Sequence, residues 1–127
     1  MNHRTDILDL RTALDVLRQT PGQLVETDVE VDPEAELSGV YRYVGAGGTV
    51  MRPTKVDGPA MMFHNIKGHP DTSVTIGVLA SRQRVANLFG VKKEELGHLL
   101  CECAKNPIQP IVTHETAPCQ EVVHRAT

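Results

Sequence analysis

The chain has 127 residues, of which 40% are hydrophobic and 23% are charged, a length and composition typical of one folded domain. Its formal net charge of −3 lacks the positive excess that draws proteins to phosphate backbones or anionic lipids, so neither nucleic acid nor a membrane is an expected partner. No apolar run is long enough to cross a membrane and the N-terminus lacks a secretory signal pattern, so the expected location is the cytoplasm.

The N-terminal part of the chain predicts a helix followed by a strand. From residue 6 to residue 18, apolar side chains recur at spacings of three and four, which predicts an amphipathic helix capped by Thr5 or Asp6. Residues 23–31 then alternate between apolar and polar side chains. This alternation is typical of a half-buried strand.

A second helix is expected to begin at Asp32, its N-cap, and to end at Gly45 in the left-handed conformation. Its buried stripe would be formed by Leu37, Val40, Tyr41 and Val44. Residues 45–57 are glycine-rich and then basic, and they predict a loop or an irregular hairpin. Two short apolar runs, residues 60–63 and 74–79, predict strands covered on both faces at the centre of a sheet.

Two further helices are expected in the second half of the chain. Ser81 can cap the first and Gly90 can end it, with an inner face made of Val85, Leu88 and Phe89. The second should run over residues 92–105, and its inward side chains would be Leu96, Leu99, Leu100 and Cys103. Asn106-Pro107 forbids its continuation.

Together these elements predict a single small α/β (α+β) domain with a mixed sheet covered by about four helices. Residues 108–113 predict extended chain, and residues 117–123 predict the start of a further strand. Because the chain stops before anything can pair with that strand, we expect a domain boundary near its end.

The glycine cluster at residues 45–49, with Arg52 and Lys55 downstream, suggests a phosphate cradle at first sight. Phosphate loops link a strand to the N-terminus of a helix, whereas this cluster follows the end of a predicted helix. The sequence therefore favours a flexible helix stop.

His98, Cys101 and Glu102 can share one face of the last predicted helix and together hold a divalent metal, which would make the chain a small metalloprotein. Thiolate zinc sites usually bring paired Cys-x-x-Cys hooks from separate segments, and the sequence has none. A half-exposed helix face explains these residues better.

No catalytic set can be assigned from the remaining polar residues. Four histidines are scattered, and none is placed beside a nucleophile with an orienting acid: His64, His69, His114 and His124. Two pairs of acids are explained better as solvated groups than as catalytic ones: Glu34 with Glu36, and Glu94 with Glu95. The odd number of cysteines fits no disulfide framework and agrees with a reducing compartment: Cys101, Cys103 and Cys119. An exposed Cys119 would be reactive, but small buried cysteines are commoner.

Several short segments stand in a characteristic order and spacing: Asp9-Leu10-Arg11, Gly22-Gln23-Leu24, Val31-Asp32-Pro33, residues 58–68 (Gly-Pro-Ala-Met-Met-Phe-His-Asn-Ile-Lys-Gly) and Ser81-Arg82. Together they resemble the N-terminal domain of the UbiD family of prenylated-flavin-dependent decarboxylases, and the likeness covers nearly the whole chain. Residues 39–49, 52–54 and 117–121 look most like the branch that acts on hydroxylated benzoic acids such as protocatechuate and gallate.

The resemblance implies a reversible, non-oxidative decarboxylation in which prenylated FMN supplies the electron sink. Family members hold the cofactor's phosphate through a divalent metal, usually Mn²⁺, with K⁺ nearby, and they use a glutamate-arginine-glutamate set at the reacting centre. Those residues belong to a later, flavin-binding domain. No catalytic, cofactor-binding or metal-binding residue is therefore assigned to this chain, and no cofactor is expected in this chain alone.

The resemblance also implies a domain plan. Residues 1–116 would form the N-terminal α/β domain, and residues 117–127 would begin the segment that leads into the flavin-binding domain. The chain alone is then expected to be inactive and to serve as a structural, cleft-closing domain. Its expected partners are the flavin-binding and C-terminal domains, further copies in a homo-oligomer, and a flavin prenyltransferase that supplies the cofactor. The alternative is a free-standing binding or interaction module without enzymatic activity.

Overall fold

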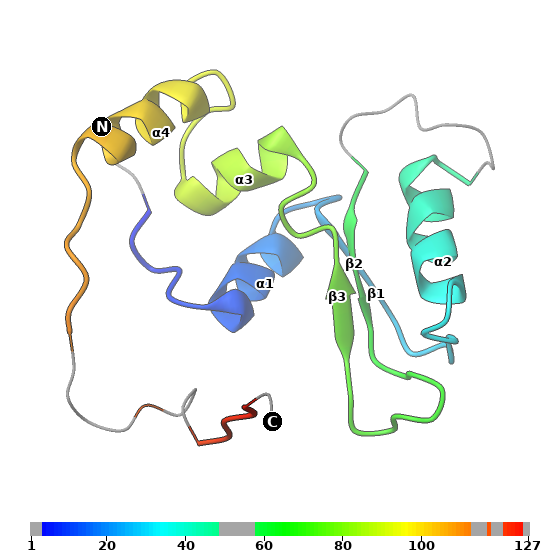
Figure 1. The fold of residues 1–127 in the computed structure, drawn as a ribbon. Coiled ribbons are helices and arrows are strands. Elements are labelled where there is room, and N and C mark those ends of the chain that lie inside the picture. Colours follow the sequence, from blue (N-terminus) through cyan, green and yellow to red (C-terminus); the bar gives the residue numbers. More distant parts are fainter. Residues whose placement is uncertain (1–3, 49–57, 113–116, 118–120, 126–127) are drawn as a thin grey trace.

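Figure 1 shows the fold of the computed structural model, which describes residues 4–48, 58–112, 117 and 121–125. In chain order its elements are α1 (Leu10–Gln19), β1 (Leu24–Thr27), α2 (Glu36–Gly45), β2 (Ala60–Phe63), β3 (Val74–Ile76), α3 (Arg82–Phe89) and α4 (Leu96–Lys105). The strands form one sheet in the order β1-β2-β3, with β1 parallel to β2 and β2 antiparallel to β3. The predicted fold class, a small α/β domain with a mixed sheet and helices around it, is confirmed.

Helix α1 begins four residues later than the sequence pattern predicts, at Leu10. The predicted caps Thr5 and Asp6 are wrong, because Asp9 and Thr12 form a reciprocal capping box instead. The Asp9 carboxylate accepts from the backbone N–H of Thr12 at 2.8 Å, and the Thr12 hydroxyl accepts from the backbone N–H of Asp9 at 3.1 Å. Asp6 is engaged elsewhere, in an ion pair with Arg4 at 2.9 Å.

Helix α2 also begins later than predicted, and Asp32 is not its N-cap. The residue at that position is Ala35, with a positive φ of 70°, and its side chain caps nothing. Asp32 belongs to the preceding turn, where its carboxylate accepts from the backbone N–H of Glu34 at 2.9 Å. The Glu36 carboxylate bonds back to the Asp32 backbone N–H at 2.7 Å, and this contact fixes the turn before the helix.

The glycine cluster ends helix α2, as predicted, but Gly45 is still helical and is not the left-handed residue. The left-handed conformation occurs at Gly47, with φ of 74°. The N–H of Gly47 bonds to the carbonyl of Val44, and the N–H of Gly48 bonds to the carbonyl of Tyr43, each at 2.9 Å. These two bonds make a Schellman motif. Residue 49 and the basic residues Arg52 and Lys55 lie outside the described residues.

The sheet is shorter than the sequence predicts, and the two apolar runs do not share its centre. Strand β2 is central and largely buried, whereas β3 lies at an edge and is half-buried, so the prediction of a central position for residues 74–79 is wrong. Gly77, with φ of 80°, turns the chain out of β3. Strand β1 ends at Thr27, and Val31 then makes only an isolated parallel bridge to Ile66.

Helices cover both faces of the sheet (Figure 1). Helix α2 packs on one face over a core formed by Val31, Leu37, Met61, Phe63 and Ile66. Helices α1 and α3 lie on the other side, where Leu17 and Ala60 are fully buried. The domain therefore has a helix, sheet and helix layer order, as expected of this fold class.

The local prediction for α3 is confirmed at both ends. The Ser81 hydroxyl accepts from the Arg84 backbone N–H at 3.3 Å, and Gly90 is left-handed with φ of 68°. The inner face differs: the fully buried positions are Arg84 and Ala86, while Phe89 is 36% exposed.

Helix α4 begins at Leu96, after a turn, and not at residue 92. Leu96 and Leu99 are buried as predicted, but Leu100 and Cys103 are exposed, so those two predictions are wrong. The helix ends at Lys105, as expected, and Asn106 is its C-cap.

The chain beyond α4 forms no strand in its described part. Ile108, Ile111 and Val112 are exposed, and so are Val122 and Val123. The predicted extended runs at residues 108–113 and 117–123 are therefore not strands where they are described. No helix in the described ranges is both long and apolar enough to span a membrane.

Candidate functional site

The most unusual polar group in the domain is the guanidinium of Arg84, which is fully buried on α3. It donates to three backbone carbonyls from three separate segments: Gln23 just before β1 at 3.2 Å, Gly58 just before β2, and Gly77 just after β3. A guanidinium carries five N–H donors in a rigid fork, so one side chain can satisfy several carbonyls at once. Arg84 therefore ties one end of all three strands to α3.

Arg84 was not among the predicted inward residues, because a charged side chain normally marks the solvent face of a helix. A signal was present in the spacing, since Arg84 stands three residues after Ser81 and four before Leu88 and so lies on the predicted inner stripe. Beside it, the Gln23 side-chain carbonyl oxygen is buried and has no hydrogen-bond partner among the residues that the structure describes. These groups hold the fold and offer neither a nucleophile nor a general base.

A second polar cluster joins α1 to the sheet. Arg18 donates to both carboxylate oxygens of Glu26, at 2.8 and 3.0 Å, and to Asp15 at 2.7 Å. His64 lies 3.2 Å from Glu26 through Nε2 and 3.4 Å from the Ser73 hydroxyl through Nδ1. The hydrogen bonds from Arg18 lower the pKa of Glu26 below its usual range, and the contact with His64 acts in the same direction. Glu26 is thus a weaker base than an ordinary glutamate.

Sequence reasoning left His64 among scattered histidines and did not place it with Glu26. The signal was the alternation of the strands, since Glu26 pairs with Met62 in the register and His64 lies two residues beyond Met62 on the same face. The cluster is a bidentate ion pair with a neighbouring imidazole, and its geometry suits attachment of α1 to the sheet.

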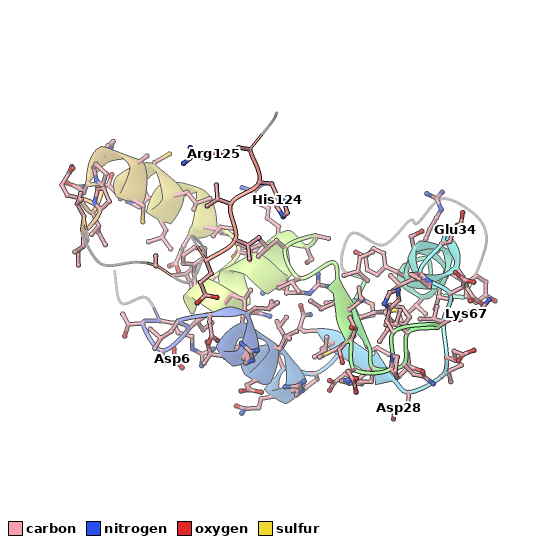
Figure 2. All side chains as sticks on the ribbon, turned by 60° about the horizontal axis from the view of Figure 1, so that its bottom comes forward. Asp6, Asp28, Glu34, Lys67, His124 and Arg125 are labelled. Carbon is pink, nitrogen blue, oxygen red and sulfur yellow. The ribbon has the colours of Figure 1, made fainter. Side chains whose placement is uncertain are left out.

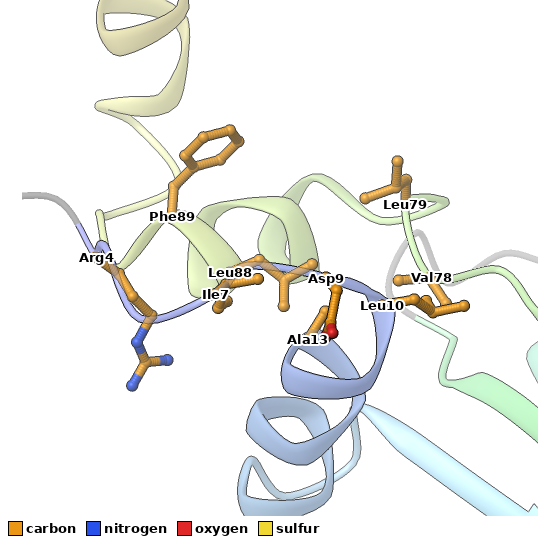
Figure 3. A pocket seen from close by; sticks show the side chains of 9 residues that line it. All are labelled: Arg4, Ile7, Asp9, Leu10, Ala13, Val78, Leu79, Leu88 and Phe89. Carbon is orange, nitrogen blue, oxygen red and sulfur yellow. The ribbon is translucent and has the colours of Figure 1, made fainter. Parts of the chain in front are cut away.

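An apolar groove of about 440 Å³ lies between the N-terminal segment, α1 and α3 (Figure 3). Its walls include Ile7, Leu10 and Leu79. The polar side chains that line it are already engaged, Arg4 in its ion pair and Asp9 in the capping box. The groove suits apolar contact and not bond-making chemistry.

His98, Cys101 and Glu102, the residues of the possible metal site, do not form a metal site in the structure. Cys101 is exposed on α4, His98 is exposed one turn earlier, and Glu102 pairs with Lys105 at 2.9 Å. Across the described residues, no group of three or more His, Cys, Asp or Glu side chains is arranged to hold a metal ion. The described residues therefore do not form the metal site considered for the last helix.

The other candidate residues stay apart. Glu34, Glu94, His69 and His124 are exposed, and Glu95 bonds the Lys92 backbone N–H at 3.1 Å in the turn before α4. His114 and Cys119 lie outside the described residues.

Comparison with known proteins gives a consistent result. The family described as "3-octaprenyl-4-hydroxybenzoate carboxy-lyase N-terminal domain" matches residues 16–104. Gallate decarboxylase from Lactiplantibacillus plantarum is 55% identical over 120 residues, which cover 94% of this chain and 24% of that protein.

Two solved structures extend the likeness to the fold. The apo 3,4-dihydroxybenzoic acid decarboxylase from Enterobacter cloacae is 49% identical with a TM-score of 0.76, over 86% of this chain and 22% of that one. The corresponding apo enzyme from Klebsiella pneumoniae is 52% identical with a TM-score of 0.73, over 82% of this chain and 21% of that one. The chain thus spans about a quarter of the length of these relatives, or slightly less.

Proposed function

Because this chain belongs to the family of UbiD-type carboxy-lyase N-terminal domains, we propose that it works as the N-terminal domain of a hydroxybenzoate decarboxylase. The observation that carries the proposal is the 55% identity to a gallate decarboxylase over 94% of the chain. The two solved 3,4-dihydroxybenzoic acid decarboxylases that share the fold support the same substrate class. The proposed substrates are therefore protocatechuate and gallate.

The proposed reaction is loss of CO₂ from the aromatic acid, with prenylated FMN as the electron sink when it is bound. By the family likeness we assign the cofactor, Mn²⁺ and K⁺ to the flavin-binding domain of the longer protein. The partners proposed are that domain, the C-terminal domain, further copies in a homo-oligomer and a flavin prenyltransferase. The proposed location is the cytoplasm.

Within that protein the proposed role of this chain is structural. Residues 1–116 would form a rigid α/β unit, and residues 117–127 would lead into the flavin-binding domain. Two features support this role: the Arg84 clamp, meaning the bonds from the Arg84 guanidinium to the carbonyls of Gln23, Gly58 and Gly77, and the Arg18–Glu26 ion pair. Both stiffen the unit without forming a reaction centre. A rigid domain of this kind can close a cleft and exclude water from a charged intermediate.

The decisive experiment compares this chain with the longer polypeptide, each expressed with and without a flavin prenyltransferase. Each sample is incubated with protocatechuate and with gallate, and catechol or pyrogallol is measured by liquid chromatography. We expect turnover and flavin absorbance only for the longer polypeptide made with the prenyltransferase. Turnover by the 127-residue chain alone would refute the proposed division of roles.

The second candidate is a free-standing binding or interaction module. The observation that favours it is that the chain contains a hydrophobic core of its own. It predicts that the chain is made and functions alone, as a stable species of defined size. A native reading frame that ends after residue 127 would support it, and a frame that continues into a flavin-binding domain would exclude it.

A further inference from the structure

The outer edge of β1 has backbone groups that the described part of the chain does not pair. Strand β1 lies at one end of the sheet order, and the carbonyls of Gln23 and Thr27 accept from β2 at 2.9 and 3.0 Å. In a parallel ladder alternate residues face the partner strand. The N–H and C=O groups of Leu24 and Glu26 therefore point away from β2, in position to receive another strand.

A groove of about 430 Å³ runs beside this edge, between β1 and α2. Its lining is mainly apolar and includes Val25, Val40, Met61 and Phe63. Val25 is 39% exposed and Val29, near the mouth, is 74% exposed. A strand added at the edge would place every second side chain in this groove.

The chain from β1 to the start of α2 is strongly acidic, and three of its acids line the groove: Glu26, Glu30 and Glu36. Between Arg18 and Arg42 the chain has no basic residue and six acidic ones: Glu26, Asp28, Glu30, Asp32, Glu34 and Glu36. Two of them are matched inside the domain, Glu26 by Arg18 and Asp32 by Lys67 at 2.8 Å.

Three of these acids are left to the solvent. Asp28, Glu30 and Glu34 are exposed and form no close ion pair with any described residue, although Glu30 adds to the effect of Asp32 in raising the pKa of Lys67. Figure 2 shows Glu34 beside α2 and Asp28 on the opposite, lower side of the same half of the molecule. Two copies of this edge would bring like charges together, which disfavours self-pairing and favours a basic partner.

We propose that the β1 edge and the adjoining groove bind an extended, basic segment of the longer decarboxylase polypeptide as a fourth strand. Its alternate apolar side chains would fill the groove, and its Lys or Arg side chains would face Asp28, Glu30 and Glu34. Strand addition of this kind draws affinity from main-chain bonds and specificity from side-chain pockets. The inference rests on the proposed function, because the occupant comes from the portion of the relatives that this chain does not span.

The test uses this chain and a capped heptapeptide of alternating lysine and valine. Amide hydrogen exchange is followed residue by residue by NMR. At a peptide concentration ten times the dissociation constant, the amides of Leu24 and Glu26 should exchange about tenfold more slowly, since protection scales with occupancy. Binding should weaken as salt screens the acids.

Two altered peptides separate strand pairing from charge. Replacing lysine by glutamate should abolish binding, and N-methylation of alternate residues on the pairing edge should do the same while keeping the charge. Failure of the basic peptide to bind, or equal binding of either altered peptide, would overturn the proposal. A concentration-dependent dimer of the chain through β1 would also overturn it.

A charge reversal in the chain gives a matched control. The double variant Asp28→Lys, Glu30→Lys should no longer bind the lysine peptide and should bind the glutamate peptide. Glu94→Lys makes the same kind of change far from the edge and should bind the lysine peptide as the parent chain does. Peptide binding is measured without cofactor or substrate. Its failure is therefore distinct from a failure of the longer polypeptide to decarboxylate.

Discussion

Replacement of Arg84 by methionine tests how much of the stability depends on the clamp at the end of the sheet. Methionine keeps most of the length of the side chain and removes every donor. The carbonyls of Gln23, Gly58 and Gly77 then lose a shared partner at sites that are buried or partly buried.

The size of the effect follows from the hydrogen bonds that disappear. A bond from a charged donor contributes about 1.5–3 kcal/mol, so three of them would give roughly 4.5–9 kcal/mol if they were independent. They share one side chain, and removal of the buried charge returns part of its desolvation cost. We expect a net loss of about 3–5 kcal/mol in the free energy of unfolding, or a fall in Tm of roughly 10–20 °C for a chain of this size.

Urea unfolding followed by circular dichroism measures this loss, since the chain has no Trp for fluorescence. Arg82→Met, on the exposed face of the same helix, is the matched control and should stay within about 0.5 kcal/mol of the parent. Arg84→Lys keeps the charge but has one nitrogen, which cannot reach three separate carbonyls, so its loss should be intermediate. An Arg84→Met protein within about 1 kcal/mol of the parent would refute the reasoning, because the lost bonds would then contribute almost nothing.

Three other perturbations test the packing and the caps. Leu17→Ala, at a fully buried position, should lower the free energy of unfolding in urea by about 2–5 kcal/mol. Leu8→Ala, at a position that is 86% exposed, should change it very little. Equal effects of the two variants would contradict the placement of α1. Gly77→Ala should destabilise the domain by about 1–3 kcal/mol, because φ is positive there and a Cβ would run into the Tyr41 ring; calorimetry should show a smaller loss in a Tyr41→Ala background. The α1 backbone and hydroxyl bonds lower the pKa of Asp9, so its contribution is complete above the ordinary aspartate pKa and is lost as the pH falls through the lowered value. Asp9→Asn should therefore flatten the acid side of the plot of Tm against pH, and an unchanged slope would show that this carboxylate is not linked to folding.

The parts of the fold that follow from local chemistry were predictable from the sequence. The cap at Ser81 and the left-handed Gly90 define α3 with residues that act within one turn of the helix. The alternation that ends at residue 31 located β1, and the apolar run at β2 located the buried central strand. In each case the signal and its cause lie in the same short segment.

The errors occur where the structure depends on a specific side-chain contact or on strand pairing that the residue pattern does not show. Asp32 has the sequence features of an N-cap. In the structure its backbone N–H donates to the Glu36 carboxylate, so Asp32 belongs to the turn before the helix. Strand β3 resembles a central strand, but whether a strand is central depends on how many others pair with it. Arg84 is buried because three carbonyls from other segments accept from it, and the local spacing indicates only that its side chain faces inward, not what it bonds there.

The arrangement of the clamp also sets an order of events during synthesis. The ribosome releases all three strands before residue 84, since β3 ends at Ile76. A nascent chain of that length has its sheet sequence complete while the carbonyls at one end still depend on water. That end of the sheet therefore cannot acquire its internal donor until α3 has been synthesised, because the guanidinium that bonds the three carbonyls lies on that helix.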